Sequence, residues 1–580
     1  MNRLYFGDNL DVLRAMPTGS VDLIYLDPPF NSNADYSLLY GTKRGGPSQA
    51  QARAFEDTWR WGRESQRALD ETADRHVDAG ALLDAFQKVL RGSNMMAYLA
   101  MMSVRLIELH RVLKSTGSMY LHCDPTASHY LKTLLDTIFT PLHFLNEIVW
   151  LRSNSHNFKT RMWPRQHDTL LLYARGDTFT LNPVYQPYGP EQLRRYKPDE
   201  NGRLHTGQDM TVSAVRRLRQ FEWRGVKPPP HRSWGASLDQ LETWYSEGRI
   251  LLKKDGTPRF DGLKVYLDET KGKQVGSVWI DIERISNTAA ERLGYPTQKP
   301  LSLLERIILS SSNEGDTVLD PFCGCGTAIE AAEKLHRNWI GIDITYLAIH
   351  VIETRLSRMF SASIRERYTL HGRPKDPESA NALAARDWLE FQKWAVITLG
   401  GLPKDRPGPD GGIDGTIRYH RVGIEQPKRA IVSVKGGLNV GVDAIHKLKS
   451  VIQREGAEVG VLICIDPPTR AMRKEADSAG EVGPSSRRVS KIQIVPVAML
   501  FQKNPIDLPG TLDPPEVGRV NIPPQPKKNR KRIEGQSEML FTMESSQELY
   551  SAPKKSRSGR PIRTVDIEVT RANPLQKKTK

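Results

Sequence analysis

Short apolar runs alternate with amphipathic segments along the first 360 residues of this chain. The runs have the length of buried strands, and the longer segments repeat apolar residues at helical spacing. The expected strands lie at residues 4–6, 21–26, 117–122, 147–150, 169–173, 316–319 and 339–343. The expected helices lie around residues 9–13 and at 81–113, 130–139, 301–311, 328–335 and 346–359. Such alternation predicts an α/β fold with a largely parallel, doubly wound sheet.

The alternation breaks in several places, which predicts the domain organisation. Residues 41–80 are polar and predict a long excursion or lid. Residues 175–290 are polar, aromatic-rich and irregular, and predict an inserted region within a domain spanning residues 1–360. After a linker near residues 360–385, a helix–loop–strand–helix–strand–helix–strand pattern predicts a smaller α/β domain at residues 386–505. Prolines and basic clusters predict a disordered basic tail at residues 506–580.

Composition narrows the class of protein. The formal net charge is +16, which suggests a polyanionic partner such as nucleic acid. Half of that charge lies in the last sixty residues, however, so a merely basic tail is an alternative explanation. Four cysteines in 580 residues indicate a reducing compartment. Without a secretory signal or an apolar run of about 18 residues, we expect a soluble, cytoplasmic protein with no membrane segment.

The first candidate for chemistry follows the apolar run at residues 21–26. Asp27, Pro28, Pro29 and Phe30 would lie at the carboxyl end of that strand, where open α/β sheets place their sites. The prolines end the strand and stiffen the turn. Asp-Pro-Pro also begins at Asp466 and Asp513, but without the aromatic residue, so the tripeptide alone is weak evidence of function.

A second candidate is the turn from Asp320 to Thr327, Asp-Pro-Phe-Cys-Gly-Cys-Gly-Thr, between an expected strand and helix. Gly324 and Gly326 would let the backbone pass close to a ligand. Asp343 ends the next strand, where it could accept two ribose hydroxyls. Asp320 and Asp343 would repel a pyrophosphate and suit a cationic adenosine ligand, which is S-adenosylmethionine. The alternative is that the glycines only pack helix against strand.

With both stretches present, the chain resembles an amino-group DNA methyltransferase of the β arrangement. That family has Asp-Pro-Pro-Phe/Tyr first, a target-recognition region in the middle, and Phe-x-Gly-x-Gly last. Here these are Asp27 to Phe30, residues 175–290, and Phe322 to Gly326. Gly-Asp-Asn at residues 7–9 and Gly-Tyr-Pro-Thr-Gln-Lys-Pro at 294–300 also resemble the family. The resemblance implies a Rossmann-like methyltransferase fold with permuted motif order over residues 1–360.

The resemblance also implies roles. Asp27 and the Pro28 carbonyl would accept hydrogen bonds from an exocyclic amine. Phe30 would stack on a base flipped out of double-stranded DNA. The implied S-adenosylmethionine-binding residues are Asp8, Asp320, Phe322, Gly324, Gly326, Thr327 and Asp343. Asp rather than Ser at position 27 favours N6-adenine, with N4-cytosine as the alternative. Members of this class often dimerise, so the resemblance allows a homodimer.

The smaller domain resembles the Mrr type of restriction-endonuclease-like fold, a PD-(D/E)XK scaffold. Asp414 in Gly-Ile-Asp-Gly matches its metal-binding Asp, and Lys435 matches its catalytic lysine. Ser433 stands where a carboxylate or Gln belongs, and a hydroxyl is a poor ligand for a hard cation. We therefore favour a DNA-binding module that does not cleave. An active nuclease that uses Mg²⁺ would make the chain a fused restriction–modification enzyme, and Glu390 could then supply a replacement carboxylate. A third alternative is a DNA-binding protein with an inactive methyltransferase scaffold.

Overall fold

The computed structural model describes most of the chain up to residue 517. The described residues are 2–29, 35–41, 47–56, 60–153, 163–286, 289–295, 297–404, 412–421, 424, 426–436, 440–513 and 516–517, with only the backbone of 35–41, 47–56 and 516–517. Phe30 lies outside them, and so do residues 518–580, where we expect the basic tail. The described residues all belong to one compact unit at residues 1–522.

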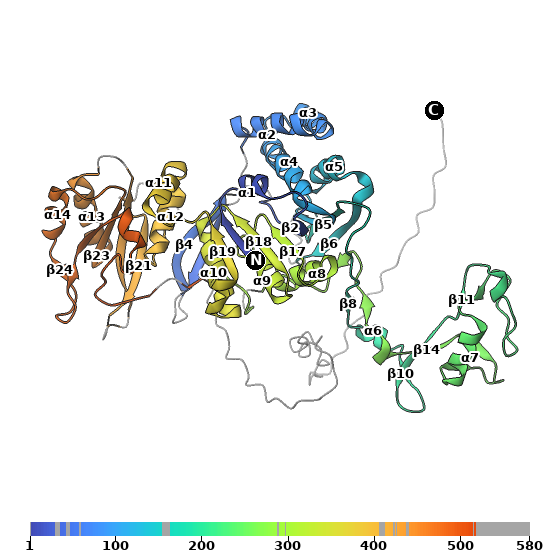
Figure 1. Cartoon of the computed structure of the whole chain (residues 1–580). Coiled ribbons are helices and arrows are strands. Elements are labelled where there is room, and N and C mark those ends of the chain that lie inside the picture. The colour runs from blue at the N-terminus through green and yellow to red at the C-terminus, as the bar shows by residue number, and fades with distance from the viewer. Residues whose placement is uncertain are drawn as a thin grey trace, which may run out of the picture. The chain divides into compact units, whose positions relative to one another are not determined.

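A nine-stranded sheet forms the centre of the described N-terminal part (Figure 1). In spatial order its strands are β16 (Val278–Trp279), β6 (Phe144–Leu151), β7 (His167–Ala174), β5 (Leu113–Cys123), β2 (Val21–Leu26), β17 (Thr317–Asp320), β18 (Asn338–Asp343), β1 (Asn2–Phe6) and β19 (Tyr368–His371). Neighbouring strands pair in parallel, except that β7 runs antiparallel to both β5 and β6. The predicted largely parallel sheet is therefore confirmed.

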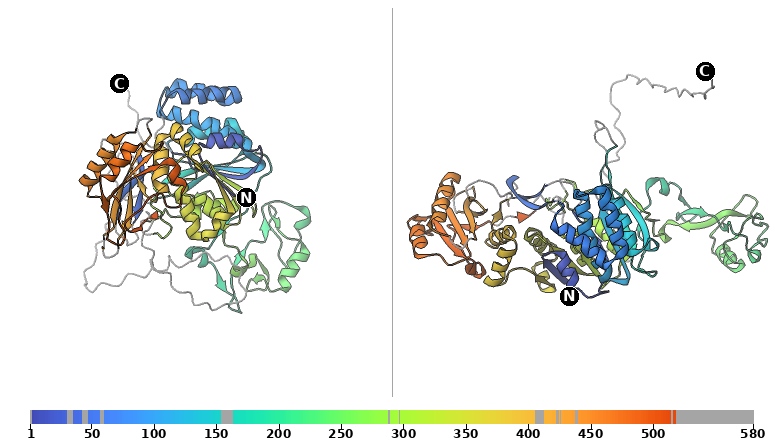
Figure 2. Two further views of the ribbon diagram at one scale, coloured as in Figure 1. Left: turned by 60° about the vertical axis from the view of Figure 1, so that its left-hand side comes forward. Right: turned by 90° about the horizontal axis from the view of Figure 1, so that it is seen from above.

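Helices cover both faces of this sheet. One face packs against α1 (Asn9–Ala15), α2 (Arg63–Arg75), α3 (Val77–Leu90), α4 (Asn94–Val112) and α5 (Ser128–Phe139). The other face packs against α8 (Leu301–Ser311), α9 (Thr327–Lys334) and α10 (Tyr346–Phe360). Seen from above in Figure 2, α2 to α5 lie over the sheet. Strand β2 is buried on both sides, because Ile24 contributes to the first core and Leu23 and Tyr25 to the second. The sheet is thus the doubly wound arrangement that the strand–helix alternation predicts.

The structure adds detail to two expectations for the region before residue 113. The polar stretch at residues 41–80, expected as an excursion or lid, includes α2, which buries Ala68, Leu69 and Thr72 against the neighbouring helices. Its few apolar residues lie on one face of a helix, so the polar composition concealed an amphipathic pattern. The helical pattern expected at residues 81–113 is confirmed as two helices, α3 and α4, which separate where Arg91 adopts a positive φ of 52° and Ser93 caps α4.

The middle region folds as several small sheets around its own aromatic core. One sheet contains β13 (Ile250–Leu252), β14 (Pro258–Tyr266), β10 (Leu204–Gln208) and β9 (Lys197–Pro198). Trp223 and Trp234 lie in that core and are almost fully buried. Both rings therefore belong to the packed interior of this region rather than to its surface. Arg224 lies over the Tyr245 ring at 3.6 Å and pairs with Glu242 at 2.6 Å.

The expected linker contributes to the main sheet. Residues 368–371 form its edge strand, β19, which pairs with β1, and α11 (Pro377–Arg386) follows. The next helix, α12 (Trp388–Thr398), precedes a second sheet in the predicted helix–strand order. This sheet contains β20 (Leu402–Pro403), β21 (Gly415–His420), β22 (Lys428–Lys435), β23 (Val459–Cys464), β26 (Ile492–Pro496) and β27 (Thr511–Leu512). Helices α13 (Val442–Glu455) and α14 (Arg470–Asp477) pack against it.

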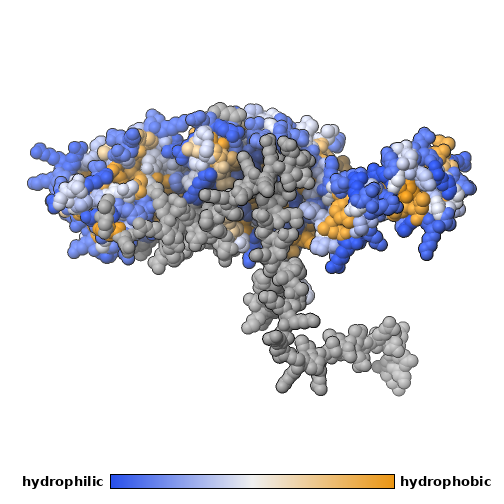
Figure 3. Space-filling model, turned by 90° about the horizontal axis from the view of Figure 1, so that it is seen from below, coloured by the Kyte–Doolittle hydropathy of each residue, from blue (hydrophilic) through white to orange (hydrophobic). Residues whose placement is uncertain are grey.

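Apolar residues on the surface form separate patches between hydrophilic ones on the face drawn in Figure 3. Among the described residues, no helix combines the length and the apolar character needed to cross a membrane.

One glycine in β18 sets how closely α9 approaches the sheet. A Cβ atom on Gly341 would lie 2.4 Å from Ile329 Cδ1 and 3.3 Å from Cys323 Sγ. We expect Gly341→Ala to overpack this contact, at a cost of about 1–3 kcal/mol, and to lower the thermal unfolding midpoint of the full chain. Gly276→Ala is the matched control, because nothing lies within 4 Å of its Cβ position. Equal midpoints for the two variants would contradict this account.

Candidate active site

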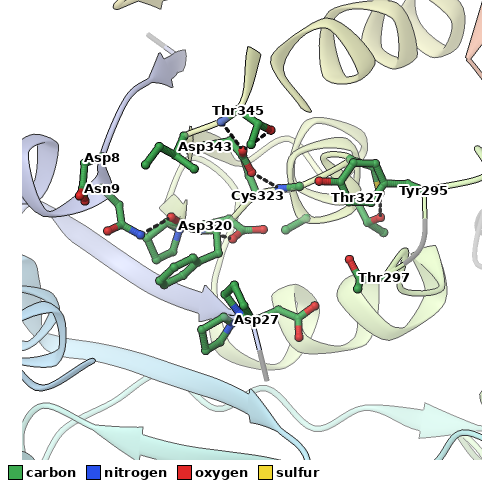
Figure 4. Close-up of a pocket in the computed structure, with 18 of the residues that line it drawn as sticks. Asp8, Asn9, Asp27, Tyr295, Thr297, Asp320, Cys323, Thr327, Asp343 and Thr345 are labelled. Carbon is green, nitrogen blue, oxygen red and sulfur yellow. Dashed lines mark hydrogen bonds between the residues drawn. The ribbon is translucent and has the colours of Figure 1, made fainter. Parts of the chain in front are cut away.

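A cavity of about 550 Å³ opens at the carboxyl ends of β1, β2, β17 and β18 (Figure 4). Its lining includes most of the site residues expected from the sequence. These are Asp8, Asp27, Pro28, Pro29, Asp320, Phe322, Gly324, Thr327 and Asp343. Gly326 lies in the same turn, immediately before Thr327. Residues almost three hundred positions apart therefore meet at one site, because β2 and β17 pair in parallel with Ile24 opposite Leu319.

The Asp27 carboxylate forms an ion pair with Lys299, through Oδ2 and Nζ. Both side chains are largely buried, with 15% and 11% of their surface exposed. Lys299 belongs to the segment at residues 294–300 that precedes α8. The ion pair holds the Asp27 carboxylate at the wall of the cavity, where its oxygens can accept hydrogen bonds.

A series of buried, hydrogen-bonded side chains begins at Tyr25 of β2. The Tyr25 hydroxyl is 3.0 Å from His122 Nδ1, and His122 Nε2 is 3.3 Å from Asp168 Oδ2. Asp168 also pairs with Arg152 at 3.1 Å. Burial acts to raise the pKa of Asp168, but His122 and Arg152 lower it overall. These contacts join β2, β5, β6 and β7 immediately below the cavity.

Positive φ angles let the turn at residues 320–327 fold over the end of the sheet. Gly324 and Gly326 have φ values of 48° and 76°, a region that favours glycine. A Cβ atom on Gly326 would also lie 2.8 Å from Ile352. Arg355 fixes the far side of the turn, because its Nη1 donates to the Cys325 carbonyl at 3.1 Å and to Thr327 Oγ1 at 2.9 Å. These contacts hold the turn in a fixed shape at the edge of the cavity that it lines.

Asp343 joins this turn to α10. Its Oδ2 accepts from the Gly324 amide at 2.9 Å, and its Oδ1 accepts from the Thr345 amide at 2.9 Å and hydroxyl at 2.8 Å. Burial raises the pKa of Asp343 to about 6, although these hydrogen bonds oppose the shift and Glu390 adds to it. The carboxylate retains lone pairs for a ligand hydroxyl on the side that faces the cavity.

At the other end of the cavity, Asp8 caps α1 by accepting from the Leu10 amide at 2.9 Å. Arg105 donates to Asp8 Oδ1 at 2.9 Å and to Asn9 Oδ1 at 2.7 Å. The Asn9 amide in turn donates to the Pro321 carbonyl at 2.8 Å. The Gly-Asp-Asn segment and the 320–327 turn therefore form one hydrogen-bonded unit.

The cavity is strongly acidic. Asp8, Asp27, Asp320, Asp343 and Glu390 line it. Burial raises the pKa of Asp320 well above its ordinary value, and Asp27 and Asp343 raise it further, while the Phe322 amide opposes the shift. Carboxyl groups that raise one another's pKa favour a bound cation, because a positive charge relieves their repulsion. These acidic groups suit the positively charged sulfonium and ammonium groups of S-adenosylmethionine.

Several lining residues were not assigned from the sequence. They are Asn9, Arg105, Tyr295, Lys299, Asp387, Leu389 and Lys393. The segment at residues 294–300 had been noted as a motif, and its single cation was the available signal for Lys299. No sequence signal placed α12 at this cavity, because its contribution depends on tertiary packing. Among the described residues, no group of three or more His, Cys, Asp or Glu side chains is placed to hold a metal ion.

The nuclease-like residues meet elsewhere. Asp414 accepts from the Val434 amide at 2.7 Å and from Gln392 Nε2 at 3.2 Å, and it lies 3.7 Å from Lys435 Nζ. Ser433 Oγ is 3.4 Å from Asp414. Burial raises the pKa of Asp414, although the Val434 amide and Lys435 oppose this. Hard divalent cations need several oxygen ligands. Among the described residues, the neighbours of Asp414 are Ser433, Gln392 and the cationic Lys435, and this set does not fit Mg²⁺. The suggestion that Glu390 replaces the missing acid is wrong, because Glu390 lines the cavity that contains Asp27 and Asp343.

Comparison with known proteins gives matches to both parts of the chain. The N6/N4 DNA methylase family model, described as "DNA methylase", matches residues 21–353. The model described as "NACHT-associated inactive Restriction Endonuclease 1" matches residues 388–499. The Type II methyltransferase M.EcaI of Enterobacter cloacae is 29% identical over 360 residues, which are 61% of this chain and 69% of that protein. The StyLTI Mod subunit of a Salmonella typhimurium Type III restriction-modification enzyme is 24% identical over 353 residues, which are 58% of this chain and 50% of the subunit.

The solved M1.HpyAVI–SAM complex is 16% identical, with a TM-score of 0.28, and covers 61% of this chain and 99% of its own. That TM-score is too low to add to the fold assignment, which rests on the strand order described above. The methylase model, by contrast, spans more than half of the 580 residues and includes both sequence candidates. This chain therefore belongs to the N6/N4 DNA methylase family, the S-adenosylmethionine-dependent enzymes that methylate exocyclic amines of DNA bases.

Proposed function

We propose that this protein methylates N6 of adenine at a specific sequence in double-stranded DNA. The observation that carries the proposal is that Asp27, at the end of β2, lines the same acidic cavity as the glycine turn and Asp343. Asp at the first position of the Asp-Pro-Pro-Phe motif, where related N4-cytosine enzymes carry Ser, supports adenine as the base. N4-cytosine is the competing assignment within the same family.

The chemistry that Asp27 would perform follows from the substrate. An exocyclic amine is a poor nucleophile, because its lone pair is delocalised into the ring. The Asp27 carboxylate and the Pro28 carbonyl would accept hydrogen bonds from the two N–H groups of the amine. These bonds would favour the pyramidal form, in which the lone pair is free. S-adenosylmethionine, when bound, supplies the electrophilic methyl group. Asp27 is then placed to take the proton that the methylated amine loses, while Lys299 stabilises the carboxylate between turnovers. Orientation and fixed charge would provide most of the rate.

DNA engagement is proposed from composition and exposure. Arg216, Arg217 and Leu218 of the middle region are exposed, and basic side chains at such positions suit phosphate contacts. A base inside the duplex must be flipped to reach the cavity, and stacking on Phe30 stays a prediction. The homodimer and the cytoplasmic location also stay predictions.

For residues 388–499 we infer DNA binding without cleavage. Ser433 and Gln392 supply neutral groups around Asp414, where metal-dependent cleavage would require further carboxylates. A module of this kind would raise the affinity of the methyltransferase for DNA.

Labelled S-adenosylmethionine incubated with unmodified DNA should give N6-methyladenine, identified by mass spectrometry of the nucleosides. Asp27→Ala should lower the single-turnover rate by at least about 100-fold, because it removes a group that acts mainly in the transition state. Asp466→Ala is a matched control, since Asp466 begins the same Asp-Pro-Pro tripeptide but is exposed. Label found only on cytosine would overturn the base assignment, and a fully active Asp27→Ala would overturn the role of Asp27.

Binding of S-adenosylmethionine should weaken as the pH falls through about 6. Asp343 has a raised pKa of about 6, so its carboxylate, the acceptor for ribose hydroxyls, becomes protonated below that pH. The loss should approach about tenfold in affinity per pH unit. Calorimetry between pH 5 and 8 measures it, and Asp343→Asn should bind weakly with a flatter pH dependence. An unchanged pH profile in Asp343→Asn would exclude Asp343 as the titrating group.

Supercoiled plasmid that carries many unmodified sites should stay intact with Mg²⁺ and the full chain. Asp414→Ala should leave the plasmid equally intact, because the wild-type chain has no second carboxylate beside Asp414 among the described residues. Nicking by the wild-type protein that disappears in Asp414→Ala would instead establish a fused restriction–modification enzyme.

A further inference from the structure

The first helix of the restriction-endonuclease-like segment lines the cavity of the methyltransferase. Leu389, Glu390 and Lys393 of α12 belong to its lining, together with the N-cap residue Asp387. The matched methylase model ends at residue 353, before this helix begins. The cavity is therefore completed by a part of the chain that lies outside the residues matched by the methylase model.

Glu390 contacts the turn that carries Asp343. Its Oε2 accepts from the backbone amide of Tyr346, the first residue of α10, at 2.9 Å. Its Oε1 accepts from Lys393 Nζ at 2.6 Å, and both side chains are at least nine-tenths buried. Tyr346 is three residues after Asp343, so α12 anchors the end of the turn that holds this carboxylate.

Two apolar side chains lie exposed at this end of the cavity. Ile344, which follows Asp343, has 56% of its surface exposed, and Leu389 has 38%. Both belong to the lining, and the Glu390–Tyr346 hydrogen bond joins the backbone segments that carry them. A purine ring needs apolar cover on its faces, whereas the ribose and the exocyclic amine need the polar groups of Asp343 and Asp8.

The opposite side of α12 is fixed to the second sheet. Gln392 donates to Asp414 at 3.2 Å. A Cβ atom on Gly436, the residue after Lys435, would lie 2.0 Å from the Trp388 ring, so Trp388 packs directly on the backbone there. The helix is thus held rigidly by the nuclease-like residues while its other face lines the cavity.

We propose that α12 forms the outer wall of the adenosine end of the S-adenosylmethionine site. Leu389 covers the adenine ring opposite Ile344, and Glu390, paired with Lys393, positions the turn that presents Asp343 to the ribose. This assigns the segment at residues 388–499 a part in cofactor binding. The inference rests on the proposed use of S-adenosylmethionine at this cavity.

Calorimetry on the full chain tests the wall directly. S-adenosylmethionine and 5′-methylthioadenosine, which has the adenosine but lacks the amino-acid end, serve as the two probes. Leu389→Ala should weaken both by about five- to tenfold, the effect of losing part of one apolar contact. Leu238→Ala, at a leucine of α7 (Leu238–Ser246) with 47% exposure, is the matched control and should bind as the wild type does.

A second pair of variants tests the positioning role of Glu390. Glu390→Gln retains an oxygen acceptor for the Tyr346 amide, so it should bind 5′-methylthioadenosine within about threefold of wild type. Glu390→Ala leaves that amide unpaired and should weaken binding about tenfold or more. The pH midpoint of binding assigned to Asp343 should fall in both variants, because each removes the negative charge that raises the pKa of Asp343. A midpoint equal to that of the wild type would contradict the placement of Glu390 beside Asp343.

The outcomes separate the two proposals. If the wild-type chain binds S-adenosylmethionine and Leu389→Ala binds equally well, the α12 wall is overturned and the proposed function stands. If the wild-type chain binds neither probe, the proposed function fails, and the wall fails with it. Weaker binding by Leu389→Ala and Glu390→Ala, with Leu238→Ala unchanged, supports the wall.

Discussion

The parallel pairing of β2 with β17 is the constraint on which the site depends. The two strands are separated by nearly three hundred residues, yet Leu23 and Ile24 lie opposite Val318 and Leu319. Parallel neighbours end at the same edge of a sheet, so Asp27 and the glycine turn must emerge together. The order of the motifs along the chain is therefore immaterial to the chemistry. What matters is that both strands are central, buried on both faces, and fixed in register.

Charge then decides what this edge can hold. Six carboxyl groups line one cavity, Asp387 among them, and burial of Asp320 and Asp343 makes their ionised forms costly without a cation. The three lining cations are each paired with an acid: Lys299 with Asp27, Arg105 with Asp8 and Lys393 with Glu390. The remaining acids leave the cavity with an excess of negative charge, which suits a ligand that carries its own positive charge and disfavours a phosphate-bearing one.

The restriction-endonuclease-like segment shows how one helix can serve two folds. The metal-binding pattern of its scaffold is incomplete, since Asp414 has Ser433 and Gln392 beside it rather than carboxylates. The acid on the same helix, Glu390, instead points toward α10. Helical geometry accounts for this division, because residues two apart face different directions. Gln392 and Glu390 therefore contact different domains from one rigid element.

The sequence by itself determined the strand–helix alternation, the two motifs at strand ends and the family, because these depend on local patterns of burial and on residue types at fixed spacing. It left the helical content of residues 60–80 and the break at Arg91 hidden, since a few apolar residues among many polar ones give a weak periodic signal. Only the tertiary structure decided that Lys299 pairs with Asp27, that Trp223 and Trp234 are core, and that Glu390 faces the cofactor cavity. Each is a contact between distant segments, and no local pattern encodes which distant surface a side chain will meet.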